Sequence, residues 1–250
     1  MTSLLVLDKV SKMFGGLLAL DNVSVALQQG EVIGLIGPNG AGKTTFVNVV
    51  TGVLKPSSGS IVFAGRRIDG LRPDRVARAG IARTFQIVQP FPHLTVRENI
   101  AAAALFAGGS STRAEAGRMA DIHLAFCGLT READKLAGSL TLAGRKRLEL
   151  AKSLASRPKL LLLDEVNAGL NAAEVDDALR LIAEIAAKGI TVLLIEHLMK
   201  VVSRSCSRIM VLHQGRLIAD GPTADVLKDE LVIEAYLGRR YAANQMGAGI

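Results

Sequence analysis

Residues 37–44 constrain the fold of this 250-residue chain more than any other stretch. They read GPNGAGKT and fit the P-loop pattern G-x-x-x-x-G-K-[ST]. EVIGLI at 31–36 reads as a buried strand, and KTTFVNVV at 43–50 reads as the start of a helix. A strand, a glycine-rich turn and a helix in this order predict a loop that holds a phosphate chain with its backbone N–H groups and the helix N-terminus.

Two side chains of this loop have a predicted chemical role. Lys43 is expected to reach the β- and γ-phosphates of a nucleotide, and the Thr44 hydroxyl is expected to ligate Mg²⁺. The alternative is a glycine-rich turn that holds no ligand. The position of the motif between a strand and a helix favours the phosphate loop.

The composition suits a folded protein of one large domain or two lobes. It is 49% hydrophobic but only 4% aromatic, so Leu, Ile, Val and Ala must fill the core. The net charge of +7 favours an acidic partner or an anionic membrane surface, although nucleotide binding alone accounts for some of it. Cys127 and Cys206 form no CxxC pattern, which fits a reducing cytosol. We expect neither a signal peptide nor a membrane span, since no apolar run reaches the roughly 18 residues that a span requires.

A second candidate site follows the four leucines at 160–163, which read as a strand buried on both faces of a parallel sheet. Asp164 and Glu165 come directly after it. We expect Asp164 to support a hydrated Mg²⁺ and Glu165 to polarise the attacking water. The alternative is a solvated acidic turn, which the P-loop in the same chain makes the weaker reading.

Three further residues have open interpretations. Gln86 ends a predicted strand at 81–86, where its side chain could contact Mg²⁺ or the attacking water. His197 follows a predicted strand at 191–195 and could bond the γ-phosphate, although a lone histidine is usually structural. Phe14 could stack on a nucleotide base or could pack as an ordinary core residue.

The remaining pattern predicts an α/β core with an antiparallel β-region and a helical insertion. Strands at 4–12 and 21–27 are expected to flank a Gly15–Gly16 turn. The capping-box sequence Thr95–Glu98 predicts a helix start, and the Ala-rich chain from there to about residue 156 reads as helical. A helix at 171–188, a hairpin at 208–220 and a helical tail from 223 to 236 complete the prediction.

The ordered set GPNGAGKT, Gln86, LLLLDE and His197 resembles the ATPases of the ATP-binding-cassette (ABC) family over nearly the whole chain. The stretches FGGLLALDNVS, RTFQ, LIEHLM and EAYLG look like the ATPase subunits of branched-chain amino-acid importers, and of related importers for amides and urea. The resemblance implies an ABC-type P-loop NTPase core with ATP and Mg²⁺ as its ligands.

The resemblance also implies site residues. Phe14 matches the base-stacking aromatic, Glu165, His197 and Gln86 match catalytic groups, and Thr44, Gln86 and Asp164 match ligands of the metal. The residues that match the nucleotide-binding Walker A loop are Gly37, Pro38, Asn39, Gly40, Ala41, Gly42, Lys43, Thr44 and Thr45. Thr141, Ala143 and Gly144 match the signature motif, which contacts the nucleotide of a second cassette closed head to tail on the first.

The signature departs from the family pattern. LSGGQ is usual, but the ungapped match anchored by Arg147 gives LTLAG at 140–144, in which both glycines are replaced. A one-residue shift would place Gly144 at the second glycine and lose the Arg147 anchor. Val166 stands where proline is usual, and Asn171 stands where the D-loop at 168–171 normally has Asp. These changes bear on activity at the site shared with a partner, and leave nucleotide binding unaffected.

The resemblance implies ATP hydrolysis that powers solute import, with the chain peripheral on the cytoplasmic side of the membrane. The implied partners are transmembrane permease subunits, a second ABC ATPase (a paralogue or a copy of this chain) and, indirectly, an extracytoplasmic solute-binding protein, with no nucleic acid. A non-transport cassette acting on ribosomes or DNA, and a weakly hydrolysing regulatory cassette, are the alternatives. The expected division is a nucleotide-binding core at 1–88 and 157–222, a helical subdomain at 89–156 and a helical tail at 223–250.

Overall fold

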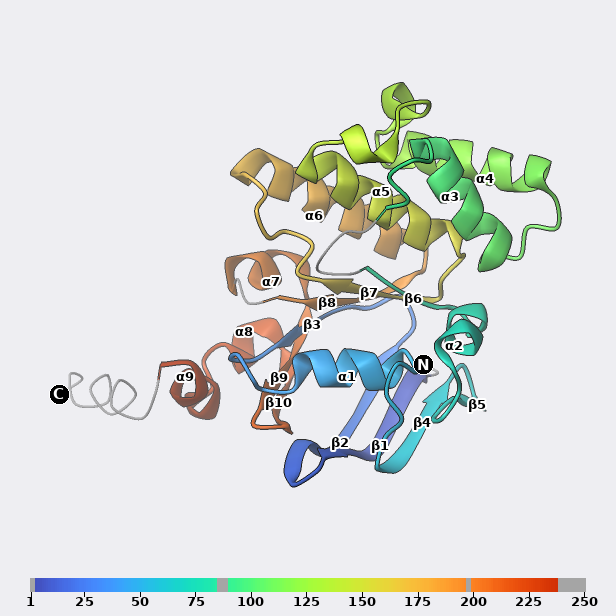
Figure 1. Cartoon of the computed structure of the whole chain (residues 1–250). Helices are drawn as coiled ribbons and strands as arrows, with labels where there is room; N and C mark the ends of the chain where they lie inside the picture. Colours follow the sequence, from blue (N-terminus) through green and yellow to red (C-terminus); the bar gives the residue numbers. More distant parts are fainter. Residues whose placement is uncertain (1–2, 85–89, 197–198, 238–250) are drawn as a thin grey trace. The chain divides into compact units, whose positions relative to one another are not determined.

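The computed structural model describes residues 3–84, 90–196 and 199–237 of the chain (Figure 1). Contacts divide the chain into two compact units. The first comprises Met1–Leu71 and Leu193–Ile250, and the second comprises Arg72–Val192.

An antiparallel sheet makes up one part of the first unit, with the strand order β2-β1-β4-β5. Strands β1 (Ser3–Phe14) and β2 (Leu17–Gln28) form the predicted hairpin, and Phe14 pairs with Leu17 across the turn. Strand β4 (Ser58–Phe63) pairs with the other edge of β1, and the short β5 (Arg66–Arg67) pairs with β4. The predicted antiparallel β-region is therefore confirmed.

The other part of the first unit is built around β3 (Val32–Ile36), which is almost fully buried. Strand β9 (Arg208–His213) runs parallel to β3, and β10 (Arg216–Pro222) runs antiparallel to β9. Residues 193–195 of β8 (Thr191–Ile195) lie on the other side of β3. Helix α1 (Lys43–Val50) follows β3 after the glycine-rich loop, with the bounds that the sequence predicts.

Three short helices complete the described part of this unit: α7 (Met199–Ser205), α8 (Thr223–Val226) and α9 (Glu230–Leu237). The sequence predicts one helix from 223 to 236, but the chain forms two. The break has a local cause, because Asp229 starts a new helix by accepting a hydrogen bond from the Leu231 N–H through its carboxylate (2.8 Å).

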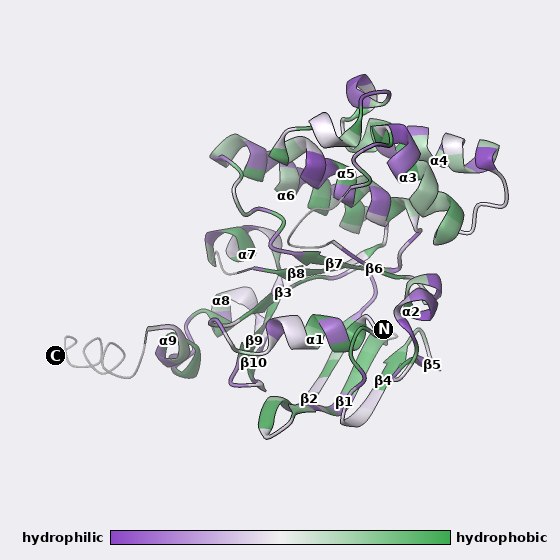
Figure 2. Ribbon diagram, viewed as in Figure 1, coloured by the Kyte–Doolittle hydropathy of each residue, from purple (hydrophilic) through white to green (hydrophobic). Residues whose placement is uncertain are grey.

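The second unit contains two parallel strands, β6 (Ile81–Arg83) and β7 (Leu160–Asp164). Figure 2 shows β7 in the colour of hydrophobic residues, and its four leucines are 0–1% exposed. The helices are α2 (Pro73–Ala79), α3 (Val96–Phe106), α4 (Arg113–Phe126), α5 (Leu142–Ala155) and α6 (Ala172–Ala187), with 3₁₀ turns at Thr130–Glu132 and Ala137–Ser139. Helix α3 packs against both α4 and α5, which gives the predicted helical insertion its core.

Helix starts follow the sequence closely in this unit. The Thr95 hydroxyl accepts from the Glu98 N–H (3.1 Å) and the Glu98 carboxylate accepts from the Thr95 N–H (2.7 Å), so the predicted capping box is confirmed. Helix α2 was not expected, although Pro73 in its first turn and Gly80 at its end are ordinary start and stop signals. Among the described residues, no helix combines the length and the apolar character that crossing a membrane requires.

Candidate functional site

The loop between β3 and α1 can be formed only with glycine at two of its positions. A Cβ atom at Gly37 would lie 2.2 Å from the carbonyl oxygen of Leu212, and one at Gly42 would lie 2.6 Å from the carbonyl oxygen of Ala19. Gly42 also has a left-handed φ of 107° just before the helix begins. The backbones of the neighbouring strands β9 and β2 therefore lie too close to the loop for a side chain at these two positions.

The ammonium of Lys43 lies against the backbone of this loop. Its Nζ donates to the carbonyl oxygens of Gly37 (2.6 Å) and Pro38 (3.1 Å). Asn39, Gly40 and Thr44 are exposed, Ala41 is buried, and Pro38, Gly42 and Thr45 are half-buried. The Thr44 side chain at the start of α1 is thus open to a ligand, and Lys43 stands at the loop that a phosphate chain would enter.

The turn between β9 and β10 supports the loop from behind. The Gly215 N–H donates to the carbonyl of Ala41, and the Gly215 carbonyl accepts from the N–H of Asp21 on β2, both at 2.9 Å. Phe14, on the hairpin that contains β2, is 43% exposed, and the Lys12 ammonium lies 5.1 Å from its ring centroid. The exposure leaves part of the aromatic ring accessible.

Sequence reasoning missed Tyr236, which α9 brings to the same loop. The Tyr236 hydroxyl is buried and meets no partner in hydrogen-bonding geometry among the described residues. Burial raises the pKa of Tyr236 to about 12, while the Gly37 backbone acts in the opposite direction and so lies near the hydroxyl. The stretch EAYLG, which resembles the importer ATPases, contains this tyrosine and is the sequence feature that could have pointed to it.

In the second unit, β7 ends at the two predicted carboxylates. Asp164 is paired with Arg83 on β6 (Nη2 to Oδ2, 3.2 Å), and the two side chains are only 13% and 12% exposed. Burial lowers the pKa of Arg83, and the charge of Asp164 acts against this shift. The Asp164 N–H also donates to the hydroxyl of Thr84 (3.2 Å), so the end of β7 is fixed to the chain that leaves β6.

These residues suit a magnesium ion that arrives with a nucleotide. Mg²⁺ is usually bound through one or two carboxylates, waters and substrate phosphates. The described residues include no group of three or more His, Cys, Asp or Glu side chains that could hold a metal. Asp164 in the second unit offers a mostly buried carboxylate, and Thr44 in the first unit offers an exposed hydroxyl. Each by itself is the kind of oxygen ligand that Mg²⁺ accepts.

Glu165, the predicted base, has an unusual backbone. Its φ of 48° is left-handed, which is rare outside glycine. Gln86 and His197 lie outside the described residues, so their predicted roles stay predictions.

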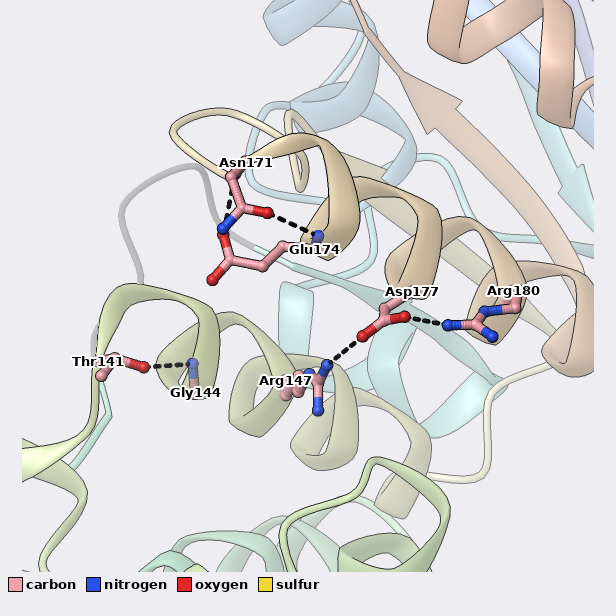
Figure 3. A network of polar contacts seen from close by, with 7 residues as sticks. All are labelled: Thr141, Gly144, Arg147, Asn171, Glu174, Asp177 and Arg180. Carbon is pink, nitrogen blue, oxygen red and sulfur yellow. Dashed lines mark hydrogen bonds and ion pairs between the residues drawn. The ribbon is translucent and has the colours of Figure 1, made fainter.

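The signature region forms the start of α5 (Figure 3). The Thr141 hydroxyl accepts from the Gly144 N–H (3.2 Å) and caps the helix, and Leu142 directly after it is 50% exposed. Ala143 and Gly144 are half-buried. At the start of α6, Asn171 and Glu174 form a second capping box, so the asparagine in the D-loop position is a working helix cap.

We expect Arg83→Met to lower the free energy of unfolding by about 3 kcal/mol, because it removes one partner of a mostly buried ion pair. Urea unfolding without nucleotide and Mg²⁺ measures the loss. The control is Arg72→Met, which breaks the exposed pair with Asp74 and should have little effect. Equal losses in the two variants would contradict the importance of the Arg83–Asp164 pair.

Comparisons with known proteins agree with this geometry. Residues 20–168 match the family described as ABC transporter, and residues 216–242 match the family described as Branched-chain amino acid ATP-binding cassette transporter. The high-affinity branched-chain amino acid transport ATP-binding protein LivG of Salmonella typhimurium is 41% identical over 94% of this chain and 98% of its own length. The protein BraF of Pseudomonas aeruginosa, with the same description, is 41% identical over 90% of this chain and 94% of its own.

Solved structures lead to the same family. A nucleotide-free ATP-binding cassette from an ABC transporter superposes with a TM-score of 0.86 at 33% identity, covering 95% of this chain and 100% of that one. CbiO1 of Clostridium perfringens, part of the ABC transporter complex CbiONQ, superposes with a TM-score of 0.83 at 28% identity, covering 98% and 100%. The predicted ABC-type P-loop fold is confirmed. The chain belongs to the ABC family and is an ATP-hydrolysing cassette related to LivG and BraF.

Proposed function

We propose that this cassette binds ATP with Mg²⁺ and uses its hydrolysis to power the import of branched-chain amino acids or related small solutes. The complete P-loop, with Lys43 against its backbone and Thr44 open at the helix start, carries the proposal for the nucleotide. The names of LivG and BraF, and the family match at residues 216–242, support the solute class.

Each site residue then has a role. Residues 37–45 hold the triphosphate, Phe14 stacks on the base, and Thr44, Asp164 and Gln86 take the Mg²⁺ side. When bound, Mg²⁺ would neutralise phosphate charge. Glu165 takes the proton of the attacking water, and His197 bonds the γ-phosphate. The division into a core at 1–88 and 157–222, a helical subdomain at 89–156 and a tail at 223–250 belongs to this proposal.

The partners follow from the same proposal. The cassette acts with transmembrane permease subunits at the cytoplasmic face of the membrane, with a second ABC ATPase, and indirectly with an extracytoplasmic solute-binding protein. Co-purification from membranes tests this assembly, followed by ATP-dependent uptake of labelled leucine into proteoliposomes. Recovery with ribosomes or DNA instead of permeases would favour the non-transport alternative.

We further propose that the two ATP sites of the working complex are unequal. In the family, glycines in the signature let the helix N-terminus approach the γ-phosphate on the opposite subunit. Leu142 and Ala143 add side chains at these two positions, and Leu142 is half exposed at the tip of α5. A loss of about 1.4 kcal/mol in the transition state would slow the affected site about tenfold. The ATP bound by Lys43 faces the signature of the partner, and the partner's ATP faces the altered signature of this chain. A paralogous partner with an intact signature would therefore preserve the site built on Lys43 and Glu165.

This asymmetry predicts unequal effects of one substitution in the two subunits. Glu165→Gln should remove most of the ATPase activity of the purified complex, and the matching change in the partner should remove less. Phosphate release measures both. The control is Glu184→Gln, which changes an exposed carboxylate of α6. Equal losses in the two variants, or a fully active homodimer of this chain alone, would contradict the asymmetry. Low ATPase activity in every assembly would favour the alternative of a weakly hydrolysing regulatory cassette.

A further inference from the structure

Lys146, a half-buried lysine on α5, bonds the backbone of the turn that follows β7. Its Nζ donates to the carbonyl oxygens of Glu165 (3.3 Å), Val166 (2.8 Å) and Ala168. An ammonium has three N–H donors, and here three acceptors come from one short stretch of backbone. None of the roles proposed above includes this lysine.

The backbone that Lys146 holds carries the predicted base. Glu165 has a left-handed φ of 48°, a strained conformation for a residue other than glycine. Such a conformation persists only when its surroundings impose it. The Ala168 N–H also donates to the Glu165 carbonyl (3.1 Å), which closes the stretch into a turn whose carbonyls converge on the ammonium. The cation therefore helps to fix the direction in which the Glu165 side chain leaves the chain.

The next residue of α5 connects the same helix to α6. Arg147 pairs with Asp177 (Nη2 to Oδ2, 3.0 Å), and Asp177 also pairs with Arg180, as Figure 3 shows. Helix α5 is thus bonded to the turn after β7 through Lys146 and to the helix after that turn through Arg147. The α5 N-terminus, where Thr141 lies, is thus connected to the backbone of Glu165 through the hydrogen bonds of Lys146.

The surroundings of Lys146 strengthen these bonds. A groove between α5 and α6 includes Lys146 in its lining, and its other lining side chains are mainly apolar, among them Leu150, Leu163 and Ile182. Charged hydrogen bonds gain strength where water is scarce. A weaker donor at position 146 should therefore hold the turn less firmly.

We propose that Lys146 is a positioning residue that couples the two ATP sites. It transmits the arrangement of the α5 N-terminus, which faces the partner's nucleotide, to Glu165, which acts on the chain's own nucleotide. This inference rests on the proposed function, because it needs a second cassette and Glu165 as the base.

The first experiment compares variants in the complete transporter complex. Lys146→Met keeps much of the stem and removes the donors, Lys146→Arg keeps a cation with several donors, and Lys135→Met is the control on an exposed lysine. We expect Lys146→Met to lower kcat for ATP about tenfold with KM within about twofold, and Lys146→Arg to restore most of kcat. Unchanged kcat in Lys146→Met would overturn the proposal. A loss of kcat in Lys146→Arg or in Lys135→Met as large as the loss in Lys146→Met would overturn it too.

The second experiment tests the coupling itself. The P-loop lysine of the partner is changed to alanine, alone and together with Lys146→Met, and hydrolysis is measured for all four complexes. We expect the partner's change to matter less once Lys146 is gone, so that the double variant is more active than the product of the two single effects. Independent, multiplicative effects would overturn the proposal.

Two further measurements keep the test decisive. If Lys146→Met fails to assemble, Lys146→Gln replaces it in both experiments, and the same outcomes apply. Glu165→Gln is assayed in parallel. Full turnover in Glu165→Gln would refute the proposed function, whereas a slow Glu165→Gln with a normal Lys146→Met would refute the coupling alone.

Discussion

Lys43→Ala is expected to weaken ATP binding by at least about 100-fold, which corresponds to about 2.7 kcal/mol. The Lys43 ammonium lies against the carbonyls of Gly37 and Pro38, at the loop that the β- and γ-phosphates would occupy. Without it, the phosphate charge is poorly compensated in a partly desolvated site. Titration calorimetry with MgATP measures the affinity, and the complex should lose its turnover as well.

Two controls separate charge from folding in this experiment. Lys228→Ala removes an exposed lysine from the chain between α8 and α9 and should bind ATP normally. Thermal unfolding without nucleotide reports whether Lys43→Ala loosens the loop, since Lys43 also bonds its backbone. Unchanged affinity and turnover in Lys43→Ala would remove Lys43 from the phosphate site.

Glu165→Gln is expected to keep ATP binding and to slow hydrolysis at the site built on Lys43 and Glu165 by about 10²–10⁴-fold. The complex should then keep only the activity of its other site. The amide has the shape of the carboxylate but cannot take a proton from water. The P-loop groups that hold the nucleotide are unaltered, so the variant should accumulate in the ATP-bound, dimeric state. Size-exclusion chromatography with ATP and an assay of phosphate release measure the two properties on one sample. Full turnover in the variant would move the catalytic role to another residue.

Local features of the fold could be predicted from the sequence because their causes are local. The loop before α1 needs glycine at fixed places, and Thr95 and Asn171 each cap a helix through a residue three positions ahead. The predicted strand at 81–86 is confirmed as far as Arg83, where β6 ends, and residues 85–89 lie outside the described residues. That boundary depends on pairing with β7, which the sequence pattern does not specify.

Three features of the candidate site could not be predicted, since each joins residues far apart in the chain. The Arg83–Asp164 pair, the bonds from Lys146 to the turn after β7, and the position of Tyr236 near Gly37 all depend on how the strands and helices pack. Motif matching finds Asp164 and Glu165 but gives no reason to examine Lys146 or Arg83. Their roles become visible only when the backbone atoms that they contact are known.

The support of the phosphate loop by the β9–β10 turn has a consequence for how the protein is made. Gly37 packs against the carbonyl of Leu212, and Ala41 accepts a hydrogen bond from Gly215, so the loop near the start of the chain is completed by residues near its end. During synthesis the P-loop sequence leaves the ribosome long before the strand that shapes it, and contacts this distant in sequence form late. A nascent cassette therefore cannot hold ATP firmly until β9 has emerged and paired with β3. Nucleotide binding in the cell would then mark chains whose first unit has finished folding.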